Sequence, residues 1–293
     1  MYFEAPFLIV QILNGLQLSA LLFLFSVGLS IVFGMMNFIN LAHGTLYMLG
    51  AYLAVSAVNW FDSFWIALAL APLGVTFVGA LFYWLLLRRL QSASPMKQVL
   101  VTFGLIFVGF DAVRMIWGRL PQTVPVPDAL SGSISVLGEI YPVYRLFIIA
   151  LGFTVMVVLT LSLDRTRFGA IVRAGVDNRT MVSALGINIE AAFFWIFCLG
   201  CYLAGLAGVV SAPVFSVFPG MDMSVLILAL IVVVVGGPGS LRGAALGAII
   251  IGMADTFGQV MIPQYARITI YALMAIILLL KPAGLLPVRA FHG

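Results

Sequence analysis

Apolar residues run along nearly the whole chain in long stretches, and short polar segments separate them. A helix needs about 20 apolar residues to cross a bilayer, and most of these stretches approach or exceed that length. The pattern predicts an all-α, polytopic transmembrane bundle of about eight or nine membrane segments, formed by residues 7–33, 41–58, 64–87, 98–117, 145–163, 191–212, 219–235, 244–261 and 267–281. Segments 41–58 and 219–235 are candidates for broken or re-entrant helices, because polar residues or glycines interrupt their ends.

The composition agrees with a chain that lies almost entirely in lipid. Of the 293 residues, 63% are hydrophobic and 8% are charged, whereas about 25% of the residues in a soluble domain are charged. Residues 1–293 are therefore expected to form a single transmembrane domain. The net charge of +4 is a small excess, which is typical of basic cytoplasmic loops and does not indicate nucleic-acid binding.

Positive charge concentrates in the segments 88–97 and 164–190, which two predicted spans separate. The positive-inside rule places both segments in the cytoplasm. Counting spans from them predicts an N-terminus outside and a C-terminus in the cytoplasm. The proline-rich segment 118–144 would then lie outside, either as an ordered connector or as a contact for a soluble partner.

Few charged or reactive side chains fall within the predicted spans. Asp111 and Arg114 lie three residues apart and are expected to pair on one helix face. Asp255 is an acid that we expect inside a span without an obvious partner nearby in the sequence. Because His43 is one of only two histidines, we expect neither a metal site nor a catalytic constellation on this chain, so it is not predicted to be an enzyme.

Small residues indicate where helices approach closely or break. Gly200, Ala204 and Gly208 recur every four residues, a spacing that favours close packing of helix backbones. A helix break is predicted at four consecutive residues, Gly236, Gly237, Pro238 and Gly239. A new helix would begin near Ser240. The run lacks the lysine of a Walker A motif, so it does not predict a nucleotide site.

The cytoplasmic segment 164–190 is longer than a connector requires. Charged residues alternate there with apolar residues at helical spacing, which are Ile171, Val172, Met181, Val182 and Leu185. The pattern predicts an amphipathic helix on the cytoplasmic surface. Its apolar strip would be covered either by a soluble partner or by lipid headgroups.

Four segments, taken in order, resemble the membrane permease subunits of branched-chain amino-acid type ABC importers. They are NFINLAHGTLYMLGAY (37–52), FGAIVRAGVDNRTMVSALGIN (168–188), VVGGPGSLRGAALGAIIIG (234–252) and KPAGLLP (281–287). The resemblance implies a permease of the bacterial inner membrane. Its partners would be a second, homologous permease, two cytoplasmic ATP-binding subunits and a periplasmic solute-binding protein, with ATP on the partner subunit and no cofactor on this chain. The solute would be a branched-chain or other neutral amino acid, an amide or urea.

The resemblance also assigns roles to particular residues. It implies that the segment 164–190 couples the chain to the ATPase, through Phe168, Gly169, Arg173, Asn178, Ala184 and Gly186. Thr45 departs from the family pattern, in which an acidic residue often follows the His-Gly pair.

We expect the solute path to be lined by three polar residues, Asn37, Asn40 and His43, since a zwitterion at the midplane needs polar side chains and helix ends. The alternative function is an autonomous secondary transporter of a small solute, which would work without an ATPase. A channel would conduct without any partner.

Overall fold

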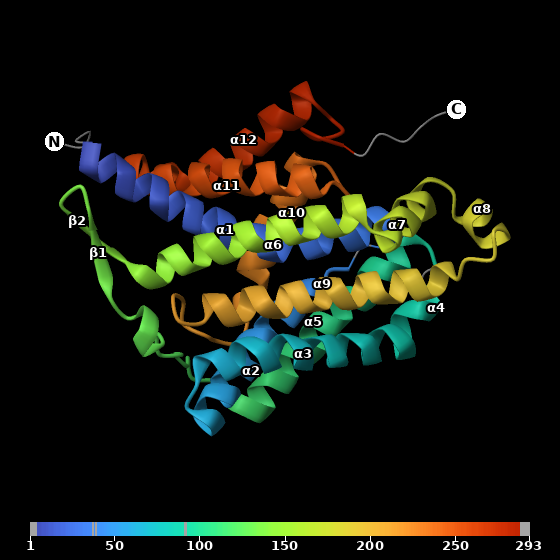
Figure 1. The fold of residues 1–293 in the computed structure, drawn as a ribbon, viewed down its shortest axis with the longest axis horizontal. Helices are drawn as coiled ribbons and strands as arrows, with labels where there is room; N and C mark the ends of the chain where they lie inside the picture. Colours follow the sequence, from blue (N-terminus) through green and yellow to red (C-terminus); the bar gives the residue numbers. More distant parts are fainter. Residues whose placement is uncertain (1–4, 37, 39, 91–92, 288–293) are drawn as a thin grey trace.

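The computed structural model describes residues 5–36, 38, 40–90 and 93–287, which form a bundle of helices with one small hairpin (Figure 1). Its long helices are α1 (Ala5–Met36), α2 (His43–Phe61), α3 (Phe64–Phe82), α5 (Pro95–Trp117), α6 (Val143–Arg165), α9 (Ile189–Ser211), α10 (Met221–Gly236), α11 (Leu241–Met261) and α12 (Ala266–Leu280). Short helices α4 (Arg88–Leu90), α7 (Arg167–Asp177) and α8 (Arg179–Ala184) lie together at one end. We call this end the basic end, and the opposite end the hairpin end.

Each of the nine predicted segments corresponds to a helix. Seven of the described helical stretches are long and apolar enough to cross a membrane. The other two, α2 and α10, are the segments that the sequence marked as broken or re-entrant. The chain is therefore a multi-pass membrane protein with an all-helical membrane domain, as predicted.

Helices α2 and α10 begin inside the bundle. The His43 ring at the start of α2 donates a hydrogen bond to the carbonyl of Phe25 (3.2 Å). Phe25 precedes the end of α1 at Met36 by eleven residues, or about 16 Å of helix. Helix α10 has 16 residues, or about 24 Å, which is shorter than the roughly 30 Å hydrocarbon core.

Helices α1 and α9 form the centre of the bundle (Figure 1). In the most apolar window of each, 78% of the residues are buried, against 17% for α5 and α6 and 11% for α12. The peripheral helices therefore present apolar side chains outward, as expected of surfaces that face lipid or another membrane subunit.

The predicted stripe of small residues on α9 allows its neighbours to approach. A Cβ atom added to Gly28 of α1 would lie 2.9 Å from the carbonyl oxygen of Gly200. Gly208 lies directly against the backbone of Tyr47 in α2. The stripe therefore joins helices within this chain, which is one of the two uses that such spacing allows.

The predicted helix break is present between α10 and α11. Gly237 and Gly239 have positive φ angles of 103° and 77°, which favour glycine. Ser240 caps α11, since its hydroxyl accepts a hydrogen bond from the Gly243 amide (2.9 Å). The segment after α12 also packs against this break. The backbone amides of Leu285 and Leu286 donate hydrogen bonds to the carbonyls of Val235 (2.8 Å) and Gly236 (3.0 Å).

The segment between α5 and α6 contains a hairpin that the sequence analysis did not predict. Strands β1 (Ser133–Val136) and β2 (Glu139–Pro142) pair antiparallel across a two-residue turn. Leu137 and Gly138 both have positive φ angles, as the favoured hairpin turn requires. An isolated bridge between Gln122 and Val217 ties the same segment to the loop before α10.

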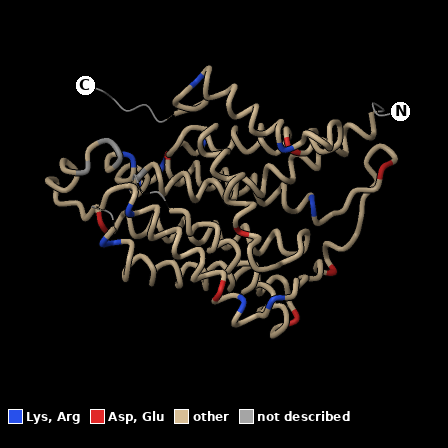
Figure 2. The backbone as a smooth tube through the Cα atoms, turned by 180° about the vertical axis from the view of Figure 1, so that it is seen from behind, with Lys and Arg blue, Asp and Glu red and all other residues tan. Residues whose placement is uncertain are grey.

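The basic end carries a concentration of Lys and Arg side chains. Figure 2, which colours the backbone by residue type, shows most of the Lys and Arg positions around the short helices and fewer of them toward the hairpin. Two ion pairs connect helices there, Arg88 with Glu190 (3.0 Å) and Arg242 with Asp164 (3.2 Å). At the hairpin end, the predicted pair of Asp111 and Arg114 is present at 3.6 Å.

Candidate functional site

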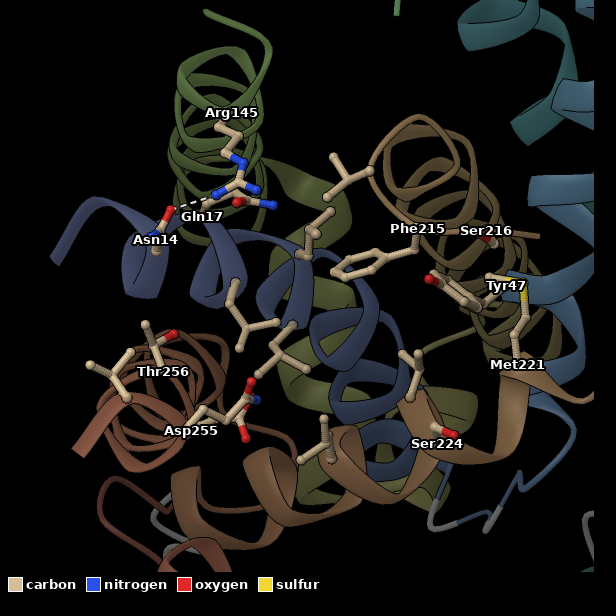
Figure 3. A pocket seen from close by; sticks show the side chains of 18 of the residues that line it. Asn14, Gln17, Tyr47, Arg145, Phe215, Ser216, Met221, Ser224, Asp255 and Thr256 are labelled. Atoms are coloured by element: carbon tan, nitrogen blue, oxygen red, sulfur yellow. Dashed lines mark hydrogen bonds between the residues drawn. The ribbon is translucent and has the colours of Figure 1, made fainter. Parts of the chain in front are cut away.

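A cavity of about 510 Å³ lies in the half of the bundle nearer the hairpin end. Side chains from α1, the start of α6, the loop between α9 and α10, and helices α10 and α11 surround it (Figure 3). One of them, Gln17, is 5% exposed and lies twelve residues along α1 from Ala5, or about 18 Å. The cavity therefore reaches well into the membrane-spanning part of the bundle.

Polar groups line this cavity in an otherwise apolar chain. They are Gln11, Asn14, Gln17, Arg145, Ser216, Ser224, Asp255, Thr256 and Gln259. Polar and ionisable groups at membrane depth are costly unless they face a water-filled or ligand-binding space. The lining is therefore compatible with water or a polar solute in this cavity.

The positive charge of the cavity comes from Arg145. It lies in the first turn of α6, where the helix dipole disfavours a cation. Its guanidinium donates a hydrogen bond to Oδ1 of Asn14 in α1 (2.6 Å). Burial raises the pKa of the Tyr141 phenol, and the nearby charge of Arg145 opposes part of this rise. Neutral polar neighbours thus orient the arginine.

The negative charge comes from Asp255 in α11, the acid that the sequence predicted inside a span. Its Oδ2 accepts a hydrogen bond from the side-chain amide of Gln259, one turn later (2.7 Å). Asp255 and Arg145 make no ion pair with any of the residues that the structure describes. The cavity therefore holds two opposite charges that are not neutralised by close contacts.

Apolar side chains complete the cavity. Leu18, Leu21 and Leu22 project from α1, and Leu228 projects from α10. Phe215, in the loop before α10, points into the space between them (Figure 3). The cavity thus combines a dipolar lining with an aliphatic surface.

The three residues predicted to line a path lie elsewhere. Asn37 falls outside the described residues. Asn40 is 2% exposed and borders a separate void of about 10 Å³. His43 is 1% exposed and packs its ring on Phe25, with 4.9 Å between centroids. Neither described residue lines the larger cavity, and their role in a path stays a prediction.

Sequence reasoning missed a buried acid, Asp222, in the first turn of α10. It is 2% exposed, and its carboxylate accepts a hydrogen bond from the Thr45 hydroxyl of α2 (3.5 Å). Helices α2 and α10 therefore meet at this pair. The sequence contains a usable indication, since Pro219 and Gly220 precede an acid, and acids favour the first turn of a helix.

Replacing Asp222 with asparagine is expected to lower thermal stability. The backbone amide of Met223 also hydrogen-bonds the carboxylate, and the charge stabilises the helix N-terminus by about 1 kcal/mol. The melting temperature in detergent should fall by roughly 2–4 °C. The control Thr45→Val leaves the amide contact in place and should cost less. An unchanged melting temperature for Asp222→Asn would show that the Asp222 charge does not stabilise the N-terminus of α10.

The predicted amphipathic segment at the basic end folds as two short helices. Thr166 caps α7 by accepting from the Gly169 amide (3.1 Å), and Asn178 caps α8 by accepting from the Met181 amide (2.9 Å). Gly186 ends the segment with a φ of 78°. The helices lie beyond the ends of α6 and α9 (Figure 1).

The six residues assigned to this segment by resemblance occupy different environments. Phe168 is half-buried against the core, Gly169 lies against the Leu163 backbone, and the Arg173 guanidinium donates to the Leu163 carbonyl. Ala184 and Gly186 are exposed. The exposed apolar surface of α8 comes instead from Met181 and from Leu185, the residue after it.

Residues 11–278 match a family described as the branched-chain amino acid transport system permease component. The chain belongs to this family. A permease component has a transport role, and the polar cavity in the bundle agrees with that role. No solved structure matches the chain.

Curated members of the family are similar over nearly their full length. The high-affinity branched-chain amino acid transport system permease protein BraD of Pseudomonas aeruginosa is 29% identical, over 94% of each chain. The corresponding LivH permease of Escherichia coli is 25% identical, also over 94% of each chain. A probable LivH permease of Methanocaldococcus jannaschii is 24% identical, over 91% of this chain and 89% of its own.

Proposed function

We propose that this chain is the membrane subunit of an ATP-driven importer of branched-chain or other neutral amino acids. The observation that carries the proposal is its similarity, over nearly the whole chain, to proteins named as branched-chain amino acid permeases. The chain forms part of the solute path, and ATP is hydrolysed on a separate subunit. Amides and urea are further solutes to test.

The distribution of charge supports one orientation in the membrane. Lys and Arg gather at the basic end (Figure 2), and positive segments stay in the cytoplasm. In the bacterial inner membrane, the hairpin end would then face the periplasm and the C-terminus the cytoplasm. The cavity lies in the half of the bundle that a periplasmic solute would enter first.

The helix pair α7–α8 is the proposed contact with the ATPase. It lies at the basic end and exposes Met181 and Leu185, which are 61% and 71% exposed. Such apolar side chains on a short, capped helix are suited to a groove on a soluble partner. Closure of the ATPase would then shift the balance between two states of the bundle, as a ligand that prefers one state does.

The remaining subunits follow from this assignment. The exposed, mostly apolar flanks of α5, α6 and α12 are available for a second, homologous permease. A periplasmic solute-binding protein would dock at the hairpin end, where Leu137 and Ile140 are 65% and 74% exposed.

Reconstitution tests the proposal. The tagged chain is purified from its native membrane with its associated subunits, placed in proteoliposomes, and supplied with labelled leucine and the solute-binding protein. We expect uptake that requires ATP and stops when the ATPase subunit loses its Walker A lysine. Uptake by the chain alone, without ATP, would instead identify a secondary transporter.

A further inference from the structure

We infer that a groove between α6 and α11 binds an anionic phospholipid, with an acyl chain along the groove and the phosphate beside Arg242. The groove has a volume of about 410 Å³ and lies between the last turns of α6 and the first turns of α11, in the half of the bundle nearer the basic end. Both helices pack on α1, which lies between them (Figure 3). The inference goes beyond the proposed function and holds for any solute that the chain carries.

The wall of the groove is apolar and open to the membrane. Four of its side chains are 38–46% exposed, namely Val157 and Leu161 on α6 and Leu246 and Ile249 on α11. The Thr160 hydroxyl, which also lines the groove, donates a hydrogen bond to a carbonyl of its own helix (2.8 Å). The wall therefore offers apolar contacts, which suit a hydrocarbon chain.

The length and position of the groove fit a lipid of one leaflet. From Arg242 to Ile249, α11 rises by about 10 Å, and half of the hydrocarbon core of a bilayer measures about 15 Å. Arg242 lies in the first turn of α11, at the end of the groove where a headgroup would lie. In the proposed orientation this end is cytoplasmic, and basic pockets between membrane helices on that side bind anionic headgroups.

The charge at this end of the groove is positive. Arg242 is 75% exposed and pairs with Asp164 at 3.2 Å, and the same carboxylate pairs with Arg173 at 4.0 Å. One acid therefore faces two guanidinium groups, and one positive charge is left over. A phosphate diester compensates this charge while its acyl chain covers the apolar wall. An apolar helix of another subunit would cover the wall but leave the charge uncompensated.

Native mass spectrometry of the purified chain with its associated subunits tests the site. The complex is stripped of native lipid and titrated with phosphatidylglycerol, or with phosphatidylcholine of the same acyl chains. The unmodified complex should bind phosphatidylglycerol more tightly. Arg242→Gln should weaken phosphatidylglycerol binding roughly fivefold, the effect of one basic side chain near an anionic lipid, and leave phosphatidylcholine binding unchanged. Leu246→Trp places a larger side chain in the groove and should weaken the binding of both lipids.

The variant Asp164→Asn separates lipid binding from a structural role. It breaks the same ion pair as Arg242→Gln, so a structural role would make both variants weaken phosphatidylglycerol binding. Lipid binding requires opposite effects, because loss of the acid frees both guanidinium groups and should tighten binding. Arg88→Gln removes another exposed, ion-paired arginine at the basic end and should change neither affinity.

Three results would overturn the inference. One is equal affinity of the unmodified complex for the two lipids. Another is weaker phosphatidylglycerol binding in both Arg242→Gln and Asp164→Asn. The third is phosphatidylglycerol binding that responds to neither Arg242→Gln nor Leu246→Trp, which is the result expected if another subunit covers the groove.

Discussion

Valine in place of Gly236 is expected to cause the largest loss of folded protein among the substitutions considered. Gly236 ends α10 directly against the start of α11, and an added Cβ atom would lie 2.9 Å from the Ala244 backbone nitrogen and closer still to Gly243. Backbone atoms cannot rotate away, so overpacking here should cost about 3 kcal/mol. The melting temperature of the purified protein should fall by roughly 6–12 °C, and its membrane yield should fall with it.

Gly104→Val is the matched control for this prediction. Gly104 lies in another membrane helix, α5, and a Cβ atom added there would have no heavy atom within 4 Å. The control should therefore retain its yield and melting temperature. Equal behaviour of the two variants would contradict the close packing of α10 on α11.

The sequence predicted the spans because apolar length is a local property. Residues 7–33 and 191–212 were recognisable as spans without any knowledge of their neighbours, and they became the central helices α1 and α9. The weak segments 41–58 and 219–235 were also informative. They became α2 and α10, the two helices that begin inside the bundle, and the glycines after 219–235 mark the end of α10.

The cavity could not be predicted in the same way because its residues meet only after packing. Asn14 and Arg145 are separated by 131 positions, and nothing in either local sequence indicates their contact. Asp255 was recognised as an unusual acid, yet its relation to Arg145 depends on how α6 and α11 flank α1. The sequence thus identified one of the two charges and missed their common site.

Two further features depend on contacts between distant segments. The hairpin turn at Leu137 and Gly138 lacks the usual asparagine or aspartate before glycine, so its sequence resembles a loop. The segment 281–287 shows no apolar period, but Leu285 and Leu286 donate hydrogen bonds to the helix break. The last two family motifs therefore form one structural unit, in which the carbonyls that end α10 gain partners.

Glutamate at both Met181 and Leu185 is expected to abolish coupling while leaving the permease folded. The two side chains are already exposed, at 61% and 71%, so their replacement removes little packing within this chain. Two carboxylates placed in an apolar groove would cost several kcal/mol on docking, and each 1.4 kcal/mol lowers affinity tenfold. Copurification of the ATPase should be lost, and ATP-driven leucine uptake should fall by at least about tenfold.

Leu120→Glu provides the control, because Leu120 is also highly exposed, at 79%, but precedes the hairpin at the other end of the bundle. This variant should keep the ATPase and its coupled uptake. If the double variant also kept them, α8 would rest on lipid headgroups, the other covering that its amphipathic pattern allows. Loss of ATPase binding with normal membrane yield would instead identify α7–α8 as the surface through which ATP hydrolysis acts on the bundle.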